Sequence, residues 1–391
     1  MRILFTCVPH PGHLLPVLPL ARAFRGRGDD VAVLVPASFA PVLSDEDLEV
    51  LVAGVDMGMV VAELARRGGT DPVGAAPQAD EMEAFARAVT LDIEVEVFAG
   101  ARVDLSIEDS VLASREWQPD LVVHDSYDYV GPLVAAALDV PSALVTLGPE
   151  MSPAFTQAAS AKVAARYEAR GLAWRPAAWV LDICPTALQR DEWQAPGGWL
   201  PLRPEAYRAP DGASRREAQP LTGQPRILVT FGTTFTSPQV VGPVLGDLSA
   251  KGAGLRMTLG LTGSAEDYEV EHGSVMFEGF LPLRQLLADI DLVVTNAGAG
   301  TVLGALAEGI PIVALPQGAD QFLHADRAVA AGAAIQVLPP AFTPDAVTAA
   351  VSTALGQPSF RENALRVAKE IAAMPAPGEV AATLASTLNS P

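Results

Sequence analysis

The stretch Leu292-Val293-Val294-Thr295-Asn296-Ala297-Gly298-Ala299-Gly300-Thr301 decides the fold of the second half of the chain. Residues 292–295 form the short apolar run that is typical of a strand buried on both faces of a parallel sheet. A glycine-rich turn follows, and a helix is predicted from about 300 to 308. Glycine lets the backbone approach a ligand closely, and the first N–H groups of a helix favour an anion such as a diphosphate.

A dinucleotide site is the competing interpretation of this turn. The glycines Gly298, Gly300 and Gly304 are spaced GxGxxxG rather than GxGxxG. Asp320 lies about far enough downstream to bind a ribose, but it lies beyond the next strand rather than at its end. Nicotinamide or flavin binding is therefore the less favoured hypothesis.

The same alternation of strand and helix recurs along the whole chain. In the second half, further strands are predicted at 226–230, 256–261, 275–277, 312–315 and 335–338, with helices near 238–250 and 282–288. In the first half, strands are predicted at 3–8, 31–35, 121–123 and 143–146, with helices between them. Such alternation predicts an α/β fold of two doubly wound, Rossmann-like parallel-sheet domains that face a central cleft.

The domain limits follow from proline content. We predict an N-terminal domain over 1–205, a Pro-rich linker over 206–224 and a C-terminal domain over 225–375. Residues 344–388 are predicted to form two helices joined around Pro375 and Gly378. The last segment, 376–391, is predicted to be a helix that returns to the N-terminal domain.

Composition excludes several other classes of protein. The 391 residues include 26 basic and 46 acidic side chains, a net charge of −20, which disfavours binding to nucleic acid or to an anionic membrane surface. Only two cysteines are present, too few for a disulfide framework or a four-thiolate zinc site. Because neither an 18-residue apolar run nor a signal-peptide cleavage site is found, a cytoplasmic protein is expected.

An ordered set of motifs across both halves resembles the bacterial GT-B natural-product glycosyltransferases, antibiotic, macrolide and polyketide types included, of the UDP-glycosyltransferase-like superfamily. The motifs are Pro11-Gly12-His13-Leu14-Leu15-Pro16, Phe231-Gly232-Thr233, the 292–301 stretch, Ala307-Glu308-Gly309-Ile310-Pro311, Pro316-Gln317-Gly318-Ala319-Asp320-Gln321-Phe322 and Ile371-Ala372-Ala373-Met374-Pro375. The resemblance implies inverting transfer of a sugar from a nucleotide diphosphate to a small acceptor. It implies no essential metal and no cofactor beyond the nucleotide-sugar co-substrate, and a homodimer is left open.

Two residues of the first half are the catalytic candidates. His13 lies where the first strand gives way to the first helix, and an imidazole there can take a proton from an acceptor hydroxyl at neutral pH. Asp125 follows the strand at 121–123 and can stabilise the protonated imidazole, although Asp also favours helix N-caps. His10 is the alternative base, and Asp128 is the alternative partner.

The donor candidates lie in the second half. In Asn296 the chain departs from the family, most of which has a His reaching the donor phosphates, and an amide is never cationic. Asp320 and Gln321 resemble the pair that binds donor-sugar hydroxyls. The full set of donor candidates is Thr233, Thr234, Phe280, Leu281, Asn296, Gly298, Ala299, Gly300, Thr301, Asp320 and Gln321.

The family resemblance also bears on the nucleotide and the acceptor. Relatives that bind a ribose tend to have Glu where this chain has Gly304, so a dTDP donor is favoured over UDP, and with it a deoxysugar. Apolar side chains in the variable stretches are candidates to bind an apolar aglycone; they are Met57, Met59, Phe85, Phe155 and Trp174.

Three hypotheses follow. The first is a hexosyltransferase of the GT-B type. The second is a sugar-nucleotide epimerase or hydrolase on the same scaffold, which would need additional acid and base groups around the sugar. The third is a non-catalytic, glycosyltransferase-like auxiliary protein, which Asn296 keeps open.

Overall fold

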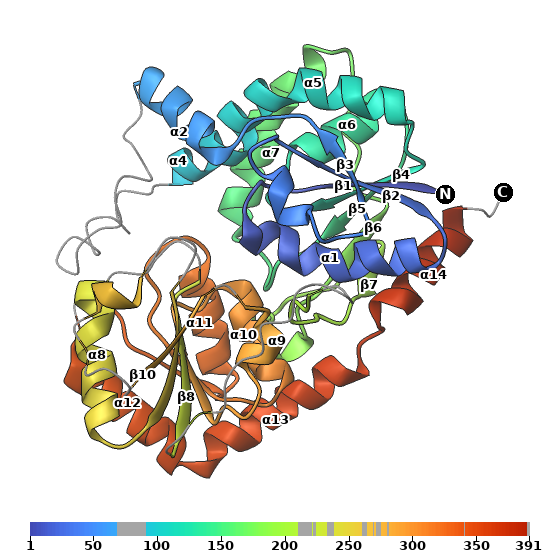
Figure 1. Ribbon diagram of the computed structural model, residues 1–391. Helices are drawn as coiled ribbons and strands as arrows, with labels where there is room; N and C mark the ends of the chain where they lie inside the picture. The colour runs from blue at the N-terminus through green and yellow to red at the C-terminus, as the bar shows by residue number, and fades with distance from the viewer. Residues whose placement is uncertain are drawn as a thin grey trace.

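The computed structural model describes residues 1–68, 91–209, 221, 224–232, 238–259, 264–268, 270, 275–279, 281–339 and 341–388. These residues form two parallel sheets, each covered by helices on both faces (Figure 1). The predicted fold class, two doubly wound α/β domains, is confirmed. No helix in this described part of the chain is long and apolar enough to span a membrane.

The first sheet has seven parallel strands in the order β3-β2-β1-β4-β5-β6-β7. They are β1 (Arg2–Thr6), β2 (Asp30–Val35), β3 (Glu49–Val52), β4 (Leu121–Asp125), β5 (Ser142–Val145), β6 (Trp179–Asp182) and β7 (Trp199–Pro201). The helices are α1 (Pro11–Gly26), α2 (Met57–Arg66), α4 (Leu91–Val95), α5 (Arg102–Trp117), α6 (Val130–Leu138) and α7 (Pro153–Glu168), with short helical turns at η1 (Ala40–Leu43), η2 (Glu96–Ala101) and η3 (Thr186–Leu188). The strand order reverses between β1 and β4, which opens a crevice at their carboxyl ends.

The second sheet has six parallel strands in the order β10-β9-β8-β11-β12-β13. They are β8 (Arg226–Thr230), β9 (Gly254–Thr258), β10 (Val275–Glu278), β11 (Leu292–Thr295), β12 (Ile312–Ala314) and β13 (Ala334–Gln336). The helices are α8 (Pro238–Ala250), α9 (Leu283–Leu286), α10 (Ala299–Ala307), α11 (Gln321–Ala330), α12 (Pro344–Gly356), α13 (Pro358–Ala373) and α14 (Pro377–Leu388), with a short turn at η4 (Ala265–Asp267). Here the order reverses between β8 and β11.

The structure corrects one predicted region and adds three strands. Residues 344–388 form three helices rather than two, because the helix breaks before Pro358: α12 ends at Gly356, Gln357 is extended, and Pro358 occupies the first turn of α13, where its missing N–H costs nothing. The strands β3, β6 and β7 were not predicted from the sequence. β7 lies at the sheet edge, where a proline is tolerated.

A shared apolar core connects the two domains. It includes buried residues of β1 and α1, of α10 and α13, and of the last helix, α14. Only three residues separate α14 from α13, but α14 packs against α1 of the first domain (Figure 1). The end of the N-terminal domain and the segment before α14 are also joined, since the N–H of Arg203 donates to the carbonyl of Pro375 at 2.8 Å.

Candidate functional site

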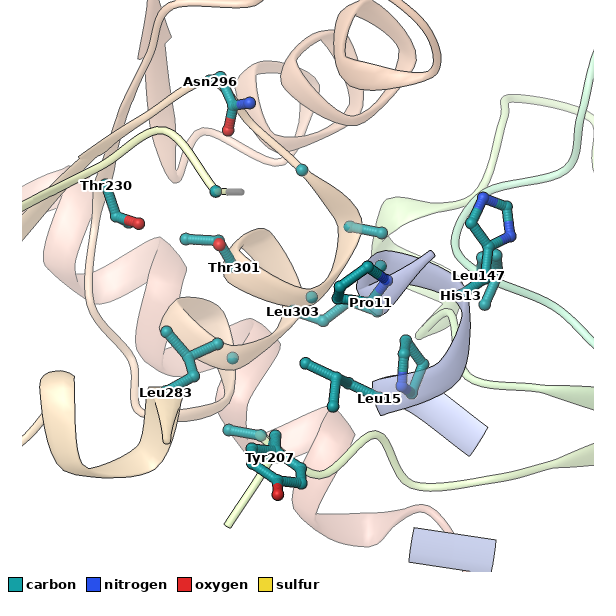
Figure 2. A pocket seen from close by; sticks show the side chains of 18 of the residues that line it. Pro11, His13, Leu15, Leu147, Tyr207, Thr230, Leu283, Asn296, Thr301 and Leu303 are labelled. Atoms are coloured by element: carbon teal, nitrogen blue, oxygen red, sulfur yellow. The ribbon is translucent and has the colours of Figure 1, made fainter. Parts of the chain in front are cut away.

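A cavity of about 330 Å³ lies between the carboxyl edges of the two sheets. Figure 2 shows His13 and Leu147 of the first domain on one side of it, and Thr230, Asn296 and Thr301 of the second domain on the other. Nine residues proposed from the sequence line this cavity together: His13, Leu281, Asn296, Gly298, Ala299, Gly300, Thr301, Asp320 and Gln321.

His13 reaches the cavity from the first turn of α1. The helix begins at Pro11, and the ring of His10 caps it by accepting a hydrogen bond from the N–H of Gly12 at 3.1 Å. The side chain of His13 is 17% exposed. Its ring lies edge-on to that of Tyr127, with 5.6 Å between the ring centroids, so the imidazole is packed on one side and open to the cavity on another.

Asp125 lies directly behind His13, at the end of β4, and its side chain is completely buried. Its Oδ1 is 3.2 Å from Nδ1 of His13 and accepts the N–H of Tyr127 at 2.7 Å, while its Oδ2 accepts the N–H of Val8 at 2.9 Å. Two backbone donors therefore fix the carboxylate. A carboxylate on Nδ1 favours the imidazole tautomer that leaves Nε2 free to accept a proton.

The alternative partner, Asp128, forms its hydrogen bonds with other groups. Its Oδ1 accepts from Nη1 of Arg102 at 2.6 Å and from the N–H of Val130 at 2.9 Å, in the first turn of α6. Burial alone would raise the pKa of Asp128, but the charge of Arg102 lowers it below its usual value. The helix-capping role considered for Asp125 is thus filled by Asp128.

The alternative base, His10, is a poor proton acceptor at neutral pH. Burial and the neighbouring His13 lower the pKa of His10 to about 4. Its Nδ1 already accepts the N–H of Gly12. General bases work best with a pKa near the working pH. The low pKa of His10 and its hydrogen bond to Gly12 therefore make it the weaker candidate for the base.

Asn296 joins the two central strands of the second sheet at the end of β11. Its Nδ2 donates to the carbonyl of Phe231, just after β8, at 3.0 Å. Its Oδ1 accepts from the hydroxyl of Thr295 at 3.3 Å. An amide nitrogen carries two hydrogens, so a second one remains for a ligand.

The first turn of α10 is built to face an anion. Ala297 is left-handed (φ 64°), and Gly298 is the N-cap of the helix. A Cβ added at Gly300 would meet no other atom within 4 Å, so the backbone is open there. The first N–H groups of a helix have no acceptor within it, and its dipole is positive at this end. The described lining of the cavity contains no Lys or Arg, so these N–H groups are its main anion donors.

Asp320 and Gln321, at the start of α11, form different contacts. The Oε1 of Gln321 accepts the N–H groups of Gln317 and Gly318, at 2.8 and 3.2 Å, which closes the turn and leaves the amide NH₂. The Oδ2 of Asp320 lies 3.2 Å from Nε2 of His324. Burial alone would raise the pKa of Asp320, but the charges of His324 and His13 lower it, so the cavity contains a carboxylate at neutral pH.

The four acceptor candidates within the described residues do not line the cavity. Met57 packs against α2 neighbours, and Phe155 is buried with its ring 5.5 Å from that of Tyr127. Met59 and Trp174 are exposed, by 52% and 58%, and face neither described cavity. Four other candidates lie outside the described residues; these are Phe85, Thr233, Thr234 and Phe280.

A second cavity, of about 250 Å³, lies beside the first and shares Leu147 and Asp320 with it. Its apolar lining includes Tyr127, Leu144, Met151, Val180, Trp193 and Leu323. Sequence reasoning missed these residues. Several of them lie on or just after β4, β5 and β6. Because β6 was not predicted, the sequence did not show that these residues share one edge of the sheet.

Comparison with known proteins identifies the family. The model described as "Erythromycin biosynthesis protein CIII-like" matches the chain in two parts, its N-terminal domain over residues 22–195 and its C-terminal domain over residues 262–387. The elloramycin glycosyltransferase ElmGT of Streptomyces olivaceus is 30% identical, over 100% of this chain and 98% of that one. The chain is an EryCIII-like glycosyltransferase.

Two further proteins show the similarity in sequence and in fold, respectively. The TDP-daunosamine transferase DnrS of Streptomyces peucetius is 28% identical, over 98% of this chain and 96% of that one. The structure of the glycosyltransferase SsfS6 of Streptomyces sp. SF2575, complexed with thymidine diphosphate, matches with a TM-score of 0.79 at 24% identity, over 99% of both chains. The resemblance to bacterial natural-product glycosyltransferases, and the prediction of an enzyme with the GT-B fold, are confirmed.

Proposed function

We propose that this EryCIII-like enzyme transfers a sugar with inversion, and that His13 is the general base. The observation that carries the proposal is the bond between His13 Nδ1 and the immobilised carboxylate of Asp125. Nε2 of His13 takes the proton of the acceptor hydroxyl as its oxygen bonds to the anomeric carbon. The bond from that carbon to the nucleoside diphosphate breaks on the opposite face, and Asp125 stabilises the imidazolium that results.

The proposed donor is a dTDP-linked deoxysugar. The diphosphate would lie at the first turn of α10, where N–H groups stabilise its growing charge, and the sugar hydroxyls would face Asp320 and Gln321. Gly304 lines the cavity without a carboxylate for a ribose. The TDP-daunosamine named for DnrS and the thymidine diphosphate of SsfS6 support the choice of nucleotide.

The proposed acceptor is an apolar natural-product aglycone bound in the second cavity. That cavity has a mainly apolar lining from the first domain, and it meets the donor cavity at Leu147 and Asp320. An acceptor hydroxyl at this junction would lie between His13 and the donor sugar. Family names of the macrolide and polyketide type favour this class of acceptor.

A product assay tests the proposal. The enzyme is incubated with polyketide aglycones and either dTDP- or UDP-sugars, with EDTA present because we propose no metal in the reaction. We expect one aglycone to gain the mass of the sugar, with release of dTDP, and NMR to show the inverted anomer. A retained anomer, or transfer abolished by EDTA and restored by a divalent cation, would contradict the mechanism.

A further inference from the structure

His324 occupies a buried position between the two domains, and the proposed reaction does not use it. It lies one turn after Asp320 on α11, its side chain is only 4% exposed, and its Nε2 is 3.2 Å from Oδ2 of Asp320. Asp320 itself is 27% exposed and lines both cavities. The pair therefore presents mainly its carboxylate to a ligand, while the imidazole, which belongs to the lining of the second cavity only, is almost fully buried.

The first domain covers the imidazole of His324. Gly148 follows β5, and a Cβ built on it would lie 2.0 Å from Cε1 and 2.9 Å from Nδ1 of His324. The backbone of the first domain is thus pressed against the imidazole of the second. With Gly148 on one side and Asp320 on the other, the ring has little freedom to turn away from the carboxylate.

We propose that His324 is a positioning residue for the donor sugar, and that Gly148 is the small residue its position requires. The inference rests on the proposed donor site. By holding Oδ2 of Asp320, the imidazole leaves Oδ1 to accept a hydroxyl of the sugar in a fixed direction. A carboxylate without this partner would rotate among its rotamers, and ordering it would weaken binding of the sugar but not of the nucleotide.

Two substitutions of His324 separate positioning from packing. His324→Phe keeps a ring against Gly148 but has no hydrogen-bond donor. His324→Gln supplies an amide N–H donor, and its nitrogen is separated from Cα by the same number of bonds as Nε2 of the histidine. Calorimetry measures the affinity of dTDP and dTDP-glucose, and of UDP and UDP-glucose, for each variant. We expect His324→Phe to bind the sugar nucleotides roughly 5- to 10-fold more weakly, the scale of one hydrogen bond, and the bare nucleotides unchanged. His324→Gln should recover most of the loss.

A substitution in the other domain tests the same contact independently. Gly148→Ala should displace the ring and give the same selective loss of sugar-nucleotide affinity. In a His324→Ala background it should add no further selective loss of sugar-nucleotide affinity, because the ring it meets is gone, whereas the backbone strain that φ 159° imposes on an alanine remains and lowers only the stability. The matched control is Gly197→Ala, on an exposed loop of the same domain where an added Cβ meets nothing within 4 Å.

The outcomes divide cleanly. Unchanged sugar-nucleotide affinity in both His324→Phe and Gly148→Ala would overturn the inference, as would an equal loss for nucleotides and sugar nucleotides, which marks a purely structural role. Wild type that binds the nucleotides but gains nothing from the glucose would also overturn it. Wild type that binds neither nucleotide would refute the proposed donor site first, and the inference with it.

Discussion

The cleft contains two carboxylate–imidazole pairs with the same 3.2 Å separation and opposite orientation. In the first domain the carboxylate, Asp125, is fully buried and the imidazole, His13, is exposed by 17%. In the second domain the imidazole, His324, is covered and the carboxylate, Asp320, is exposed by 27%. The more exposed member decides the role that we propose for each pair: a general base for His13 in the first, and a hydrogen-bond acceptor for a sugar hydroxyl for Asp320 in the second.

The secondary structure explains the difference. Asp125 ends a central strand, so backbone N–H groups on both sides hold it inside the protein. Asp320 precedes a helix at the rim, and His324, in the next turn of that helix, reaches it. The first pair is fixed by the sheet, whereas the second depends on a contact between domains.

The largest expected effect breaks the first pair at its exposed member. His13→Ala should lower the rate of sugar transfer by roughly 100-fold or more, the usual scale of general-base catalysis, because it removes the proposed proton acceptor. The affinity for dTDP should be nearly unchanged, since His13 belongs to the acceptor side. Steady-state rates and calorimetry measure the two quantities.

His10→Asn is the matched control for that prediction. Asn is a favoured N-cap, so the start of α1 is retained while the second imidazole is removed. We expect a loss of less than about 10-fold, well below the range of general-base effects. Near-normal transfer by His13→Ala, or a larger defect in His10→Asn, would show that the base is assigned to the wrong histidine.

The two carboxylates should differ in how much they contribute to the free energy of unfolding. Asp125→Ala strands the buried N–H groups of Val8 and Tyr127, so it should lower the free energy of unfolding by about 2 to 4 kcal/mol. Asp320→Ala should cost about 1 kcal/mol or less, because its side chain is reached by solvent. Urea denaturation compares the two. Equal losses would mean that the contrast between sheet-fixed and rim carboxylates is unfounded.

A smaller effect concerns nucleotide preference at Gly304. We expect dTDP to bind at least as tightly as UDP, and Gly304→Glu to shift the preference toward UDP by about 1 kcal/mol, the net value of one hydrogen bond. A Cβ there would lie 2.8 Å from Cδ2 of Leu283, the flexible end of a side chain. Calorimetry on Gly304→Glu with and without Leu283→Ala separates crowding from recognition. Wild type that prefers UDP tenfold would refute the dTDP assignment.

The smallest effect is a pH dependence of stability from His10. Its folded pKa of about 4 lies below the usual 6.5, so between these values the unfolded chain binds more protons there. Stability from this group is complete above about pH 6.5 and declines as the pH falls toward 4. When the pH falls from 7 to 4.5, the Tm of wild type should therefore decrease by about 2 to 4 °C more than the Tm of His10→Asn. His124, whose pKa burial also lowers, titrates in both proteins. Identical pH profiles would contradict the assignment.

Much of the fold and one half of the site could be predicted from sequence because the signals are local. The run 292–295 and the turn after it required only pattern and glycine chemistry. Even the meeting of His13 with Asp125 followed from strand-end positions, because carboxyl ends of parallel strands share one edge.

What could not be predicted depends on packing between distant segments. Met59 and Trp174 are apolar residues in variable stretches, yet they are exposed on the surface rather than lining a cavity. The second cavity depends on β6, whose four residues carried no clear strand signal. His324 reads as one more polar helix residue until Gly148, from the other domain, is found against it.

The return of the last helix has a consequence for recombining members of this family. α14 follows the second domain in the chain but packs against α1, whose first turn carries His13. A chimera that takes everything after the linker from a relative would place a foreign helix against α1, which carries the proposed base. The exchange should instead end near Pro375, where the chain returns to the first domain and the carbonyl of Pro375 accepts the N–H of Arg203. Each α1 then keeps the C-terminal helix with which it is matched.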